Sequence, residues 1–149
     1  MRRLTLLLMA SLSLAFAHAP FPKEERDPNK AELAKLQGRW LLVSNVVTLP
    51  EGRVLLTNVV GAVSFAGNRM VQGDYPENWR GWHIGLNART RPKQIDFISN
   101  RGLILWGVYS LDGDTLTICW AERRLSGRPK DLTGKQVGQW VEVYKRVKQ

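Results

Sequence analysis

Short apolar or alternating runs recur along the sequence between turn residues, and this recurrence constrains the fold more than any other feature. They occupy residues 39–48, 53–57, 60–65, 69–73, 81–88, 94–99, 103–110 and 115–121, with 138–147 as a ninth candidate. The segments Gly67-Asn68 and Leu111-Asp112-Gly113-Asp114 join neighbouring runs with the chemistry of tight hairpin turns. Closing such a meander removes exposed strand edges. We therefore predict an all-β fold, a small antiparallel up-and-down barrel of about eight strands with one short N-terminal helix; a curled sandwich is the alternative.

The N-terminus has the layout of a secretory signal peptide. Two arginines follow Met1, and an uncharged run rich in Leu and Ala extends from Leu4 to Phe16, too short to span a bilayer as a stable helix. Small residues then favour cleavage after Ala17, and an uncut membrane anchor is the alternative reading. The only cysteine, Cys119, is far from this boundary, which excludes lipid attachment there. We expect residues 1–17 to be a signal peptide that exports the protein to the periplasm or the extracellular space.

The rest of the chain divides into a leader and one domain. Residues 18–29 are predicted to be a flexible leader before a domain at 30–149, because they are rich in proline and charge and offer little to bury. Asn29 followed by Glu32 resembles a capping box, and Gly38 can end the short helix that it would begin. No second apolar segment follows, so we expect no transmembrane segment in the mature chain.

The chain is strongly basic, with 22 Lys and Arg residues against 13 Asp and Glu residues. Removal of Arg2 and Arg3 with the signal peptide leaves 20 basic residues and a net charge of +7. Export argues against nucleic acid as a partner, because the anions outside the cytoplasm are mostly lipid headgroups and acidic polysaccharides. A solvated loop is the simplest reading of the one local cluster of positive residues. This cluster consists of Arg123, Arg124, Arg128 and Lys130.

Several segments occur in the order of a known family. They are Leu36-Gln37-Gly38-Arg39-Trp40, Arg91-Pro92-Lys93-Gln94-Ile95-Asp96-Phe97, the run from Gly107 to Cys119, Arg128-Pro129 and Tyr144-Lys145-Arg146. Over about residues 33–147 the chain resembles the uncharacterised lipocalin-like domain family that is expanded as paralogues in planctomycete bacteria. The resemblance implies a small lipocalin-like barrel, usually behind a signal peptide, with no assigned activity.

The resemblance also implies how one end of the barrel is closed. In lipocalins generally, the tryptophan of a Gly-x-Trp element closes that end, and an arginine of the last strand stacks over it. Gly38, Trp40 and Arg146 match these positions, which implies a structural role for them. A cation held over an indole contributes about 0.5–2 kcal/mol. The periodicity of the last run leaves its inward face open, because Arg146 shares parity with Trp140 and Tyr144 but not with the valines beside them.

Aromatic residues on the predicted strands are the candidate ligand-binding residues. They are Trp82, Trp106, Tyr109 and Trp120. If the barrel closes, some of these flat, amphipathic rings face inward and can line a pocket for a small hydrophobic ligand such as a lipid, an isoprenoid or a sugar. The alternative is that the rings fill the core.

Groups suited to catalysis are scarce, so we assign no catalytic residue and predict neither a metal nor a cofactor. His83 alternates with apolar neighbours and is expected at the surface. Cys119 lies in an apolar run, where a buried, inert thiol is the expectation. Asp112 and Asp114 flank Gly113 as in a hairpin turn and lack the further oxygen ligands of a calcium loop.

One acidic residue on a predicted strand has a proposed structural partner. Asp96 alternates with apolar residues, and we hypothesise that it anchors Arg128, beside Pro129. Both residues lie in segments that carry the family resemblance.

Three classes of function stay open. The first is a binding module outside the cytoplasm that holds a small apolar or amphipathic molecule. The second is a structural or interaction domain whose basic face docks on an anionic envelope polymer, on lipid headgroups or on a protein partner. An enzyme ranks last because acids, bases and nucleophiles are so few, and we predict a protein that is not an enzyme.

Overall fold

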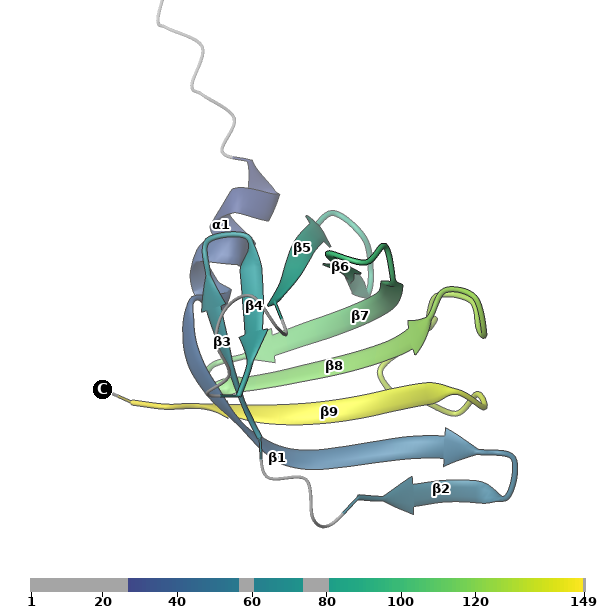
Figure 1. The fold of residues 1–149 in the computed structure, drawn as a ribbon. Helices are drawn as coiled ribbons and strands as arrows, with labels where there is room; N and C mark the ends of the chain where they lie inside the picture. Colours follow the sequence, from purple (N-terminus) through teal and green to yellow (C-terminus); the bar gives the residue numbers. More distant parts are fainter. Residues whose placement is uncertain (1–26, 57–60, 74–80, 149) are drawn as a thin grey trace, which may run out of the picture.

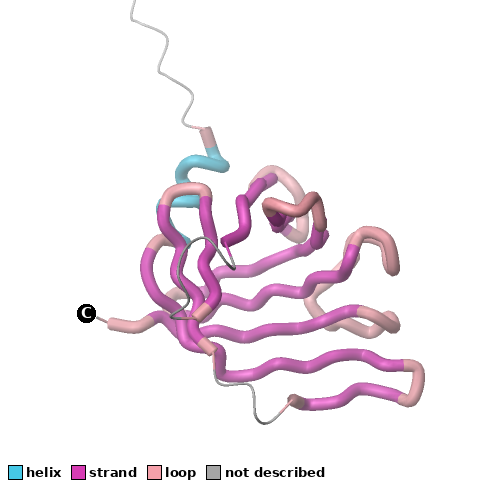
Figure 2. The backbone as a smooth tube through the Cα atoms, viewed as in Figure 1, coloured by secondary structure: helices cyan, strands magenta, loops and turns pink. Residues whose placement is uncertain are grey.

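The computed structural model describes residues 27–56, 61–73 and 81–148, which form one helix and an antiparallel sheet (Figures 1 and 2). The predicted signal peptide and most of the predicted leader lie outside the described residues. The elements are α1 (Pro28–Leu36), β1 (Gly38–Leu49), β2 (Gly52–Leu55), β3 (Ala62–Ala66), β4 (Arg69–Gln72), β5 (Gly81–Asn87), β6 (Lys93–Ser99), β7 (Ile104–Asp112), β8 (Thr115–Glu122) and β9 (Gln139–Arg146). Each strand corresponds to one of the predicted runs.

The sheet closes on itself, because β1 pairs with β9 as well as with β3. Every pairing is antiparallel, and the strands from β3 to β9 pair in chain order. β3 pairs with the first part of β1 and β2 with its last part, both along the same edge, and β9 pairs along the opposite edge. The barrel therefore has eight strands, and β2 is an additional strand beside it. The predicted all-β barrel with a single short helix is confirmed.

A β-bulge in β1 changes which side chains face the interior. The pairing of β1 with β9 shifts register between Leu42 and Ser44. Trp40 is fully buried before the bulge, and Asn45 and Val47 are buried after it. An extra residue at a bulge reverses the parity of the residues that follow. This reversal explains why both parities of the first run are apolar in the sequence.

Helix α1 packs at one end of the barrel, where Trp40 and Arg146 close the interior. The guanidinium carbon of Arg146 lies 4.1 Å from the centroid of the Trp40 ring. Arg146 also donates hydrogen bonds to the backbone oxygens of Gln37 and Lys35, at 2.8 and 2.6 Å. The indole nitrogen of Trp40 donates to the oxygen of Leu36, the last residue of α1, at 2.8 Å. The structure therefore contains the stacked pair that the family resemblance implied.

The beginning of α1 differs from the prediction. The helix starts at Pro28, so the last two residues of the predicted leader are helical, and Asp27 is the N-cap, with its side chain accepting from the amide of Asn29 at 3.0 Å. The capping box of Asn29 and Glu32 was thus wrong. Proline is well suited to the first helical position, because it lacks an amide hydrogen and its φ is already helical, and the residue before it then provides the cap. The Asn29 side chain instead accepts from the amide of Ala88 at 2.8 Å.

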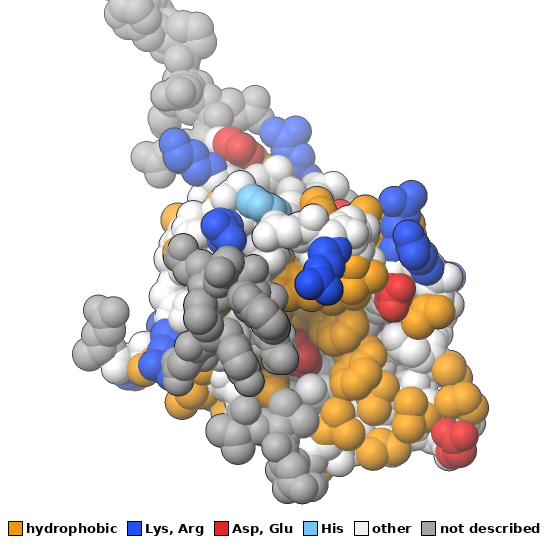
Figure 3. All heavy atoms as spheres, in the orientation of Figure 1, with side chains coloured by type: hydrophobic (Ala, Val, Ile, Leu, Met, Phe, Trp, Pro, Cys, Tyr) orange, Lys and Arg blue, Asp and Glu red, His pale blue; other side chains and the backbone are white. Residues whose placement is uncertain are grey.

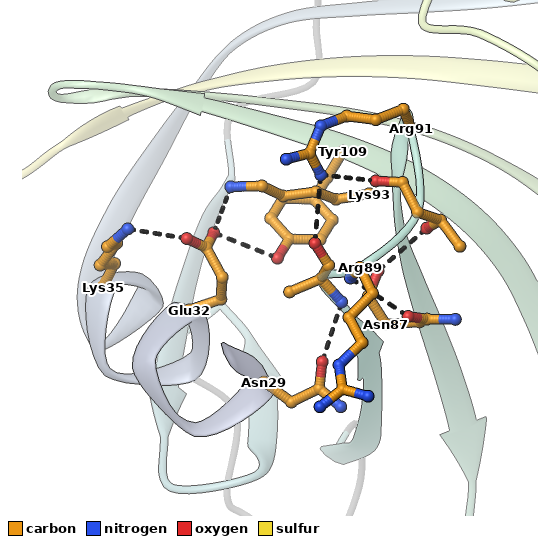
Figure 4. A network of polar contacts seen from close by, with 10 residues as sticks. Asn29, Glu32, Lys35, Asn87, Arg89, Arg91, Lys93 and Tyr109 are labelled. Atoms are coloured by element: carbon orange, nitrogen blue, oxygen red, sulfur yellow. Dashed lines mark hydrogen bonds and ion pairs between the residues drawn. The ribbon is translucent and has the colours of Figure 1, made fainter. Parts of the chain in front are cut away.

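Glu32 joins a polar network that fixes α1 to the barrel (Figure 4). Glu32 is only 6% exposed, and its carboxylate accepts from the ammonium groups of Lys35 and Lys93, each at 2.7 Å. The hydroxyl of Tyr109 lies 3.4 Å from the same carboxylate. Burial alone would raise the pKa of Glu32, but the hydrogen bonds and charges of the two lysines lower it on balance. The helix is therefore held by a buried acid whose charge is compensated.

The outer face of β7, β8 and β9 is also covered. Val108, Cys119 and Val141 form a second apolar cluster, against which Leu132 of the connection between β8 and β9 packs. Burial raises the pKa of the Cys119 thiol to about 11, and the charge of Asp131 adds to the rise. The expectation of a buried thiol is confirmed.

Candidate functional site

A pocket of about 160 Å³ lies inside the barrel, away from the end closed by Trp40. Strands β4 to β9 all contribute to its wall. Figure 3 shows hydrophobic side chains gathered around a hollow on one face of the molecule. The lining residues are Met70, Gln72, Trp82, Phe97, Leu105, Ile118, Trp120, Glu142 and Tyr144.

The alternation of side chains along the strands explains this lining. Residues two apart on a strand share a face, so Ile118 and Trp120 of β8 both point inward, as do Glu142 and Tyr144 of β9. Ile118 lies directly across from Glu142 in the pairing of β8 with β9. The inward face of β9 is therefore the one that carries Tyr144 and Arg146, which the periodicity alone had left open.

Two aromatic pairs hold the walls of the pocket. The rings of Trp82 and Phe97 meet edge to face, with centroids 6.5 Å apart and planes at 79°. Trp120 stacks on Trp140, which lies directly across from it on β9, with centroids 5.2 Å apart and planes at 1°. Such pairs add stability beyond the area that they bury and restrict the orientation of each ring. The aromatic walls are thus preorganised.

A buried carboxylate, that of Glu142, faces the pocket. Glu142 is 8% exposed, and its carboxylate accepts from the hydroxyl of Tyr144 at 2.7 Å. The side-chain amide of Asn45, across from it on β1, donates at the longer distance of 3.5 Å. Burial raises the pKa of Glu142, and hydrogen bonds from Tyr144 and Trp120 oppose part of that rise. Burial and the neighbouring carboxylate also raise the pKa of Tyr144, which stays a neutral donor.

The structure separates the four aromatic candidates. Trp82 and Trp120 line the pocket, as the sequence suggested. Tyr109 faces inward but lies at the closed end, beside Glu32, and does not line the pocket. The choice of Trp106 as a pocket residue was wrong, because its side chain faces outward. Trp106 lies next to the inward Leu105, and successive residues on a strand point to opposite faces.

Trp106 has two arginines of the predicted basic cluster as its neighbours. The guanidinium carbons of Arg123 and Arg128 lie 5.1 and 5.5 Å from the centroid of its ring. Arg128 also forms an ion pair of 2.6 Å with Asp96 and donates to the oxygen of Gly107 at 2.9 Å. No donor in the described residues makes a well-directed hydrogen bond to the Asp96 Oδ1, so the pair is held mainly by charge. The structure thus contains the contact that was hypothesised between Asp96 and Arg128.

We expect this ion pair to couple its two residues measurably. Replacing Asp96 with asparagine and Arg128 with methionine, singly and together, should show a coupling of about 0.5–1 kcal/mol in a double-mutant cycle of urea unfolding. The value is modest because both side chains are partly exposed to solvent. Losses of stability that simply add would show that Asp96 does not anchor Arg128.

The remaining acidic and histidine candidates have structural positions. Asp112, Gly113 and Asp114 form the predicted hairpin turn between β7 and β8, and Asp114 pairs with Arg146 at 3.3 Å. His83 is exposed. Within the described ranges, no group of three or more histidine, cysteine or acidic residues is placed to hold a metal ion. Nor is any helix in that part of the chain long and apolar enough to cross a membrane.

Sequence reasoning missed Glu142, Asn45 and the Trp140 stack. A signal for Glu142 was present, because it shares parity with Trp140 and Tyr144 and lies between two valines. No such signal marked Asn45, since its inward orientation depends on the bulge in β1.

No protein-family model, curated protein or solved structure matches the chain. Its function must therefore be inferred from the pocket and from the sequence.

Proposed function

We propose that the protein is a lipocalin-like binding domain that works outside the cytoplasm and holds a small apolar or amphipathic molecule in the barrel. The observation that carries this proposal is the pocket, which has aromatic and aliphatic walls and a few convergent polar groups. Pockets of that composition are typical of small-molecule sites. Export and membership in the planctomycete lipocalin-like family are part of the proposal, supported by the N-terminal 17 residues and by the order of the motifs.

The dimensions of the pocket limit the ligand. A cavity of about 150 Å³ lined by apolar side chains accommodates a molecule such as benzene. The present pocket, at about 160 Å³, therefore suits a single ring or a short branched chain. Gln72 is an exposed residue of the lining and marks the mouth, where a longer molecule would extend into solvent. Burial of the ligand's apolar surface against preorganised rings supplies the affinity.

Docking through the basic cluster has less support. Arg123 and Arg128 already contact Trp106, and Arg128 is paired with Asp96. Their charges are therefore partly engaged within the molecule, which favours the pocket over the cluster as the functional site.

Blocking the pocket should weaken binding of a neutral probe. We expect isothermal titration calorimetry to detect binding of 2-phenylethanol to the protein. Replacement of Leu105 with tryptophan should reduce this affinity about tenfold or more, because the larger side chain fills part of the pocket. Ile104→Trp is the matched control, since Ile104 immediately precedes Leu105 on β7 and faces outward, across from Ile98. Equal affinities for the two variants would contradict the proposed function.

A further inference from the structure

We propose that the ligand is an organic amine, with an apolar body in the aromatic pocket and an ammonium group that pairs with the carboxylate of Glu142. This inference rests on the proposed function and specifies the chemical class of its ligand. It follows from a charge and a set of rings that line the pocket, and from an acceptor atom beside that charge.

The charge of Glu142 has no partner in the pocket. Its neighbours on β1 and β9 are Asn45 and Tyr144, which are neutral. The described lining residues from β4 to β8 are also neutral. Glu142 and Tyr144 are therefore the titratable groups of the described lining, and no described lining residue carries a positive charge. These neutral residues are Met70, Gln72, Trp82, Phe97, Leu105, Ile118 and Trp120.

The other buried glutamate of the described chain shows what a compensated carboxylate looks like in this barrel. Glu32 is 6% exposed and Glu142 is 8% exposed. Glu32 is bound by Lys35 and Lys93, each at 2.7 Å, and its pKa is lowered. Glu142 has only uncharged donors, and burial raises its pKa. A buried carboxylate without a counter-ion is strongly unfavourable, and a bound cation would remove that cost.

A polar atom near Glu142 lacks a hydrogen-bond donor. The Oδ1 atom of Asn45 is buried without a hydrogen-bond partner in the described structure. The amide nitrogen of the same side chain is the group that donates weakly to Glu142, so this acceptor lies close to the carboxylate. An unsatisfied buried acceptor is costly, and an ammonium group has three donors. Asn45 does not itself line the pocket, but an ammonium group paired with Glu142 would lie near this acceptor.

The aromatic walls suit a cation as well as an apolar body. Trp82, Phe97 and Trp120 line the same pocket as Glu142. A cation near an aromatic face is attracted by the ring quadrupole, most strongly when both are removed from water. An anion gains nothing from these faces and is repelled by the carboxylate, so the pocket discriminates by charge.

Three probes of similar size and different charge test this inference by calorimetry: 2-phenylethylamine, 2-phenylethanol and 3-phenylpropanoate. We expect the protein to bind the amine at least about tenfold more tightly than the alcohol, and the carboxylate more weakly than both. The variant Glu142→Gln should lose about 10- to 100-fold in affinity for the amine while its affinity for the alcohol changes little. Binding of the alcohol also shows that this variant is folded.

The pH dependence gives an independent readout in the unaltered protein. Below the raised pKa of Glu142 the carboxyl is protonated, and binding of the ammonium must release that proton to solvent. The affinity for the amine should therefore rise with pH, by up to about tenfold per pH unit, until the pH exceeds the pKa of Glu142. Affinity for 2-phenylethanol should not follow this profile.

The outcomes separate this inference from the proposed function. Equal binding of amine and alcohol, an unchanged amine affinity in Glu142→Gln, or tightest binding of the carboxylate would each overturn the inference while leaving the pocket as a binding site. Failure of all three probes to bind would overturn the proposed function as well.

Discussion

Replacing Trp40 with alanine is expected to lower the free energy of unfolding by about 3–5 kcal/mol, the range for removing a large aromatic side chain from a core. Trp40 is fully buried, belongs to the main hydrophobic core and donates a hydrogen bond to the last residue of α1. Its removal leaves a cavity at the closed end and takes the aromatic face away from Arg146. Urea unfolding followed by circular dichroism measures the loss.

Two further variants show how much of this loss of stability is specific to the closed end of the barrel. Arg146→Met should cost less than Trp40→Ala but more than a surface change, since it removes a cation–π contact of about 0.5–2 kcal/mol and hydrogen bonds to two backbone oxygens. Trp106→Ala is the matched control, because this indole lies on the outer face, and we expect it to cost about 1–2 kcal/mol. If Trp40→Ala costs no more than Trp106→Ala, Trp40 does not close the barrel as described.

Replacing Gly134 with alanine is expected to cost about 2–4 kcal/mol, the sum of backbone strain and overpacking. Gly134 has a φ of +59°, and a Cβ there would overlap the Cγ2 atom of Val141 and approach the sulfur of Cys119 at 3.6 Å. The oxygen of Gly134 also accepts a hydrogen bond from the hydroxyl of Thr48. This glycine therefore holds the connection between β8 and β9 tightly against the outer face.

The chain offers a control that isolates the steric part. Gly113 has a φ of +54°, but a Cβ there would meet no atom within 4 Å, so Gly113→Ala should cost only about 1 kcal/mol. Thiol labelling gives a second readout: the Cys119 thiol should resist iodoacetamide in the unaltered protein and in Gly113→Ala, and should react faster in Gly134→Ala as its cover loosens. Equal losses of stability in the two variants would show that the connection is not packed tightly here.

The strands were predictable because their signals are local. Alternation and turn chemistry located each strand, and the Leu111-Asp112-Gly113-Asp114 turn joins β7 and β8 as expected. Closure was inferred from the general cost of exposed edges, yet the pairing of Trp40 with Arg146 joins opposite ends of the chain and has no local signal. The helix boundary was misplaced because the proline at position 28 was read as part of the leader and not as the first helical residue.

The candidate site was only half predictable, for a physical reason. Periodicity distinguishes inside from outside only when one face of a strand is polar. On β7 and β8 both faces are covered: Tyr109 and Ile118 lie in the barrel core, whereas Val108 and Cys119 pack beneath the connection to β9. Trp106 was therefore as plausible a pocket residue as Trp120. In β1 the bulge reversed the parity and hid the inward orientation of Asn45.

The central claim is that a ligand enters the barrel and does not bind the outer surface. The indole N–H signals of Trp82 and Trp120 in a two-dimensional ¹H–¹⁵N spectrum test it most directly, because Trp40 and Trp106 provide internal references at the closed end and on the outer face. On titration with 2-phenylethylamine, we expect the signals of Trp82 and Trp120 to shift and those of Trp40 and Trp106 to stay in place. Shifts confined to Trp106, or no shift at Trp82 and Trp120, would contradict the account.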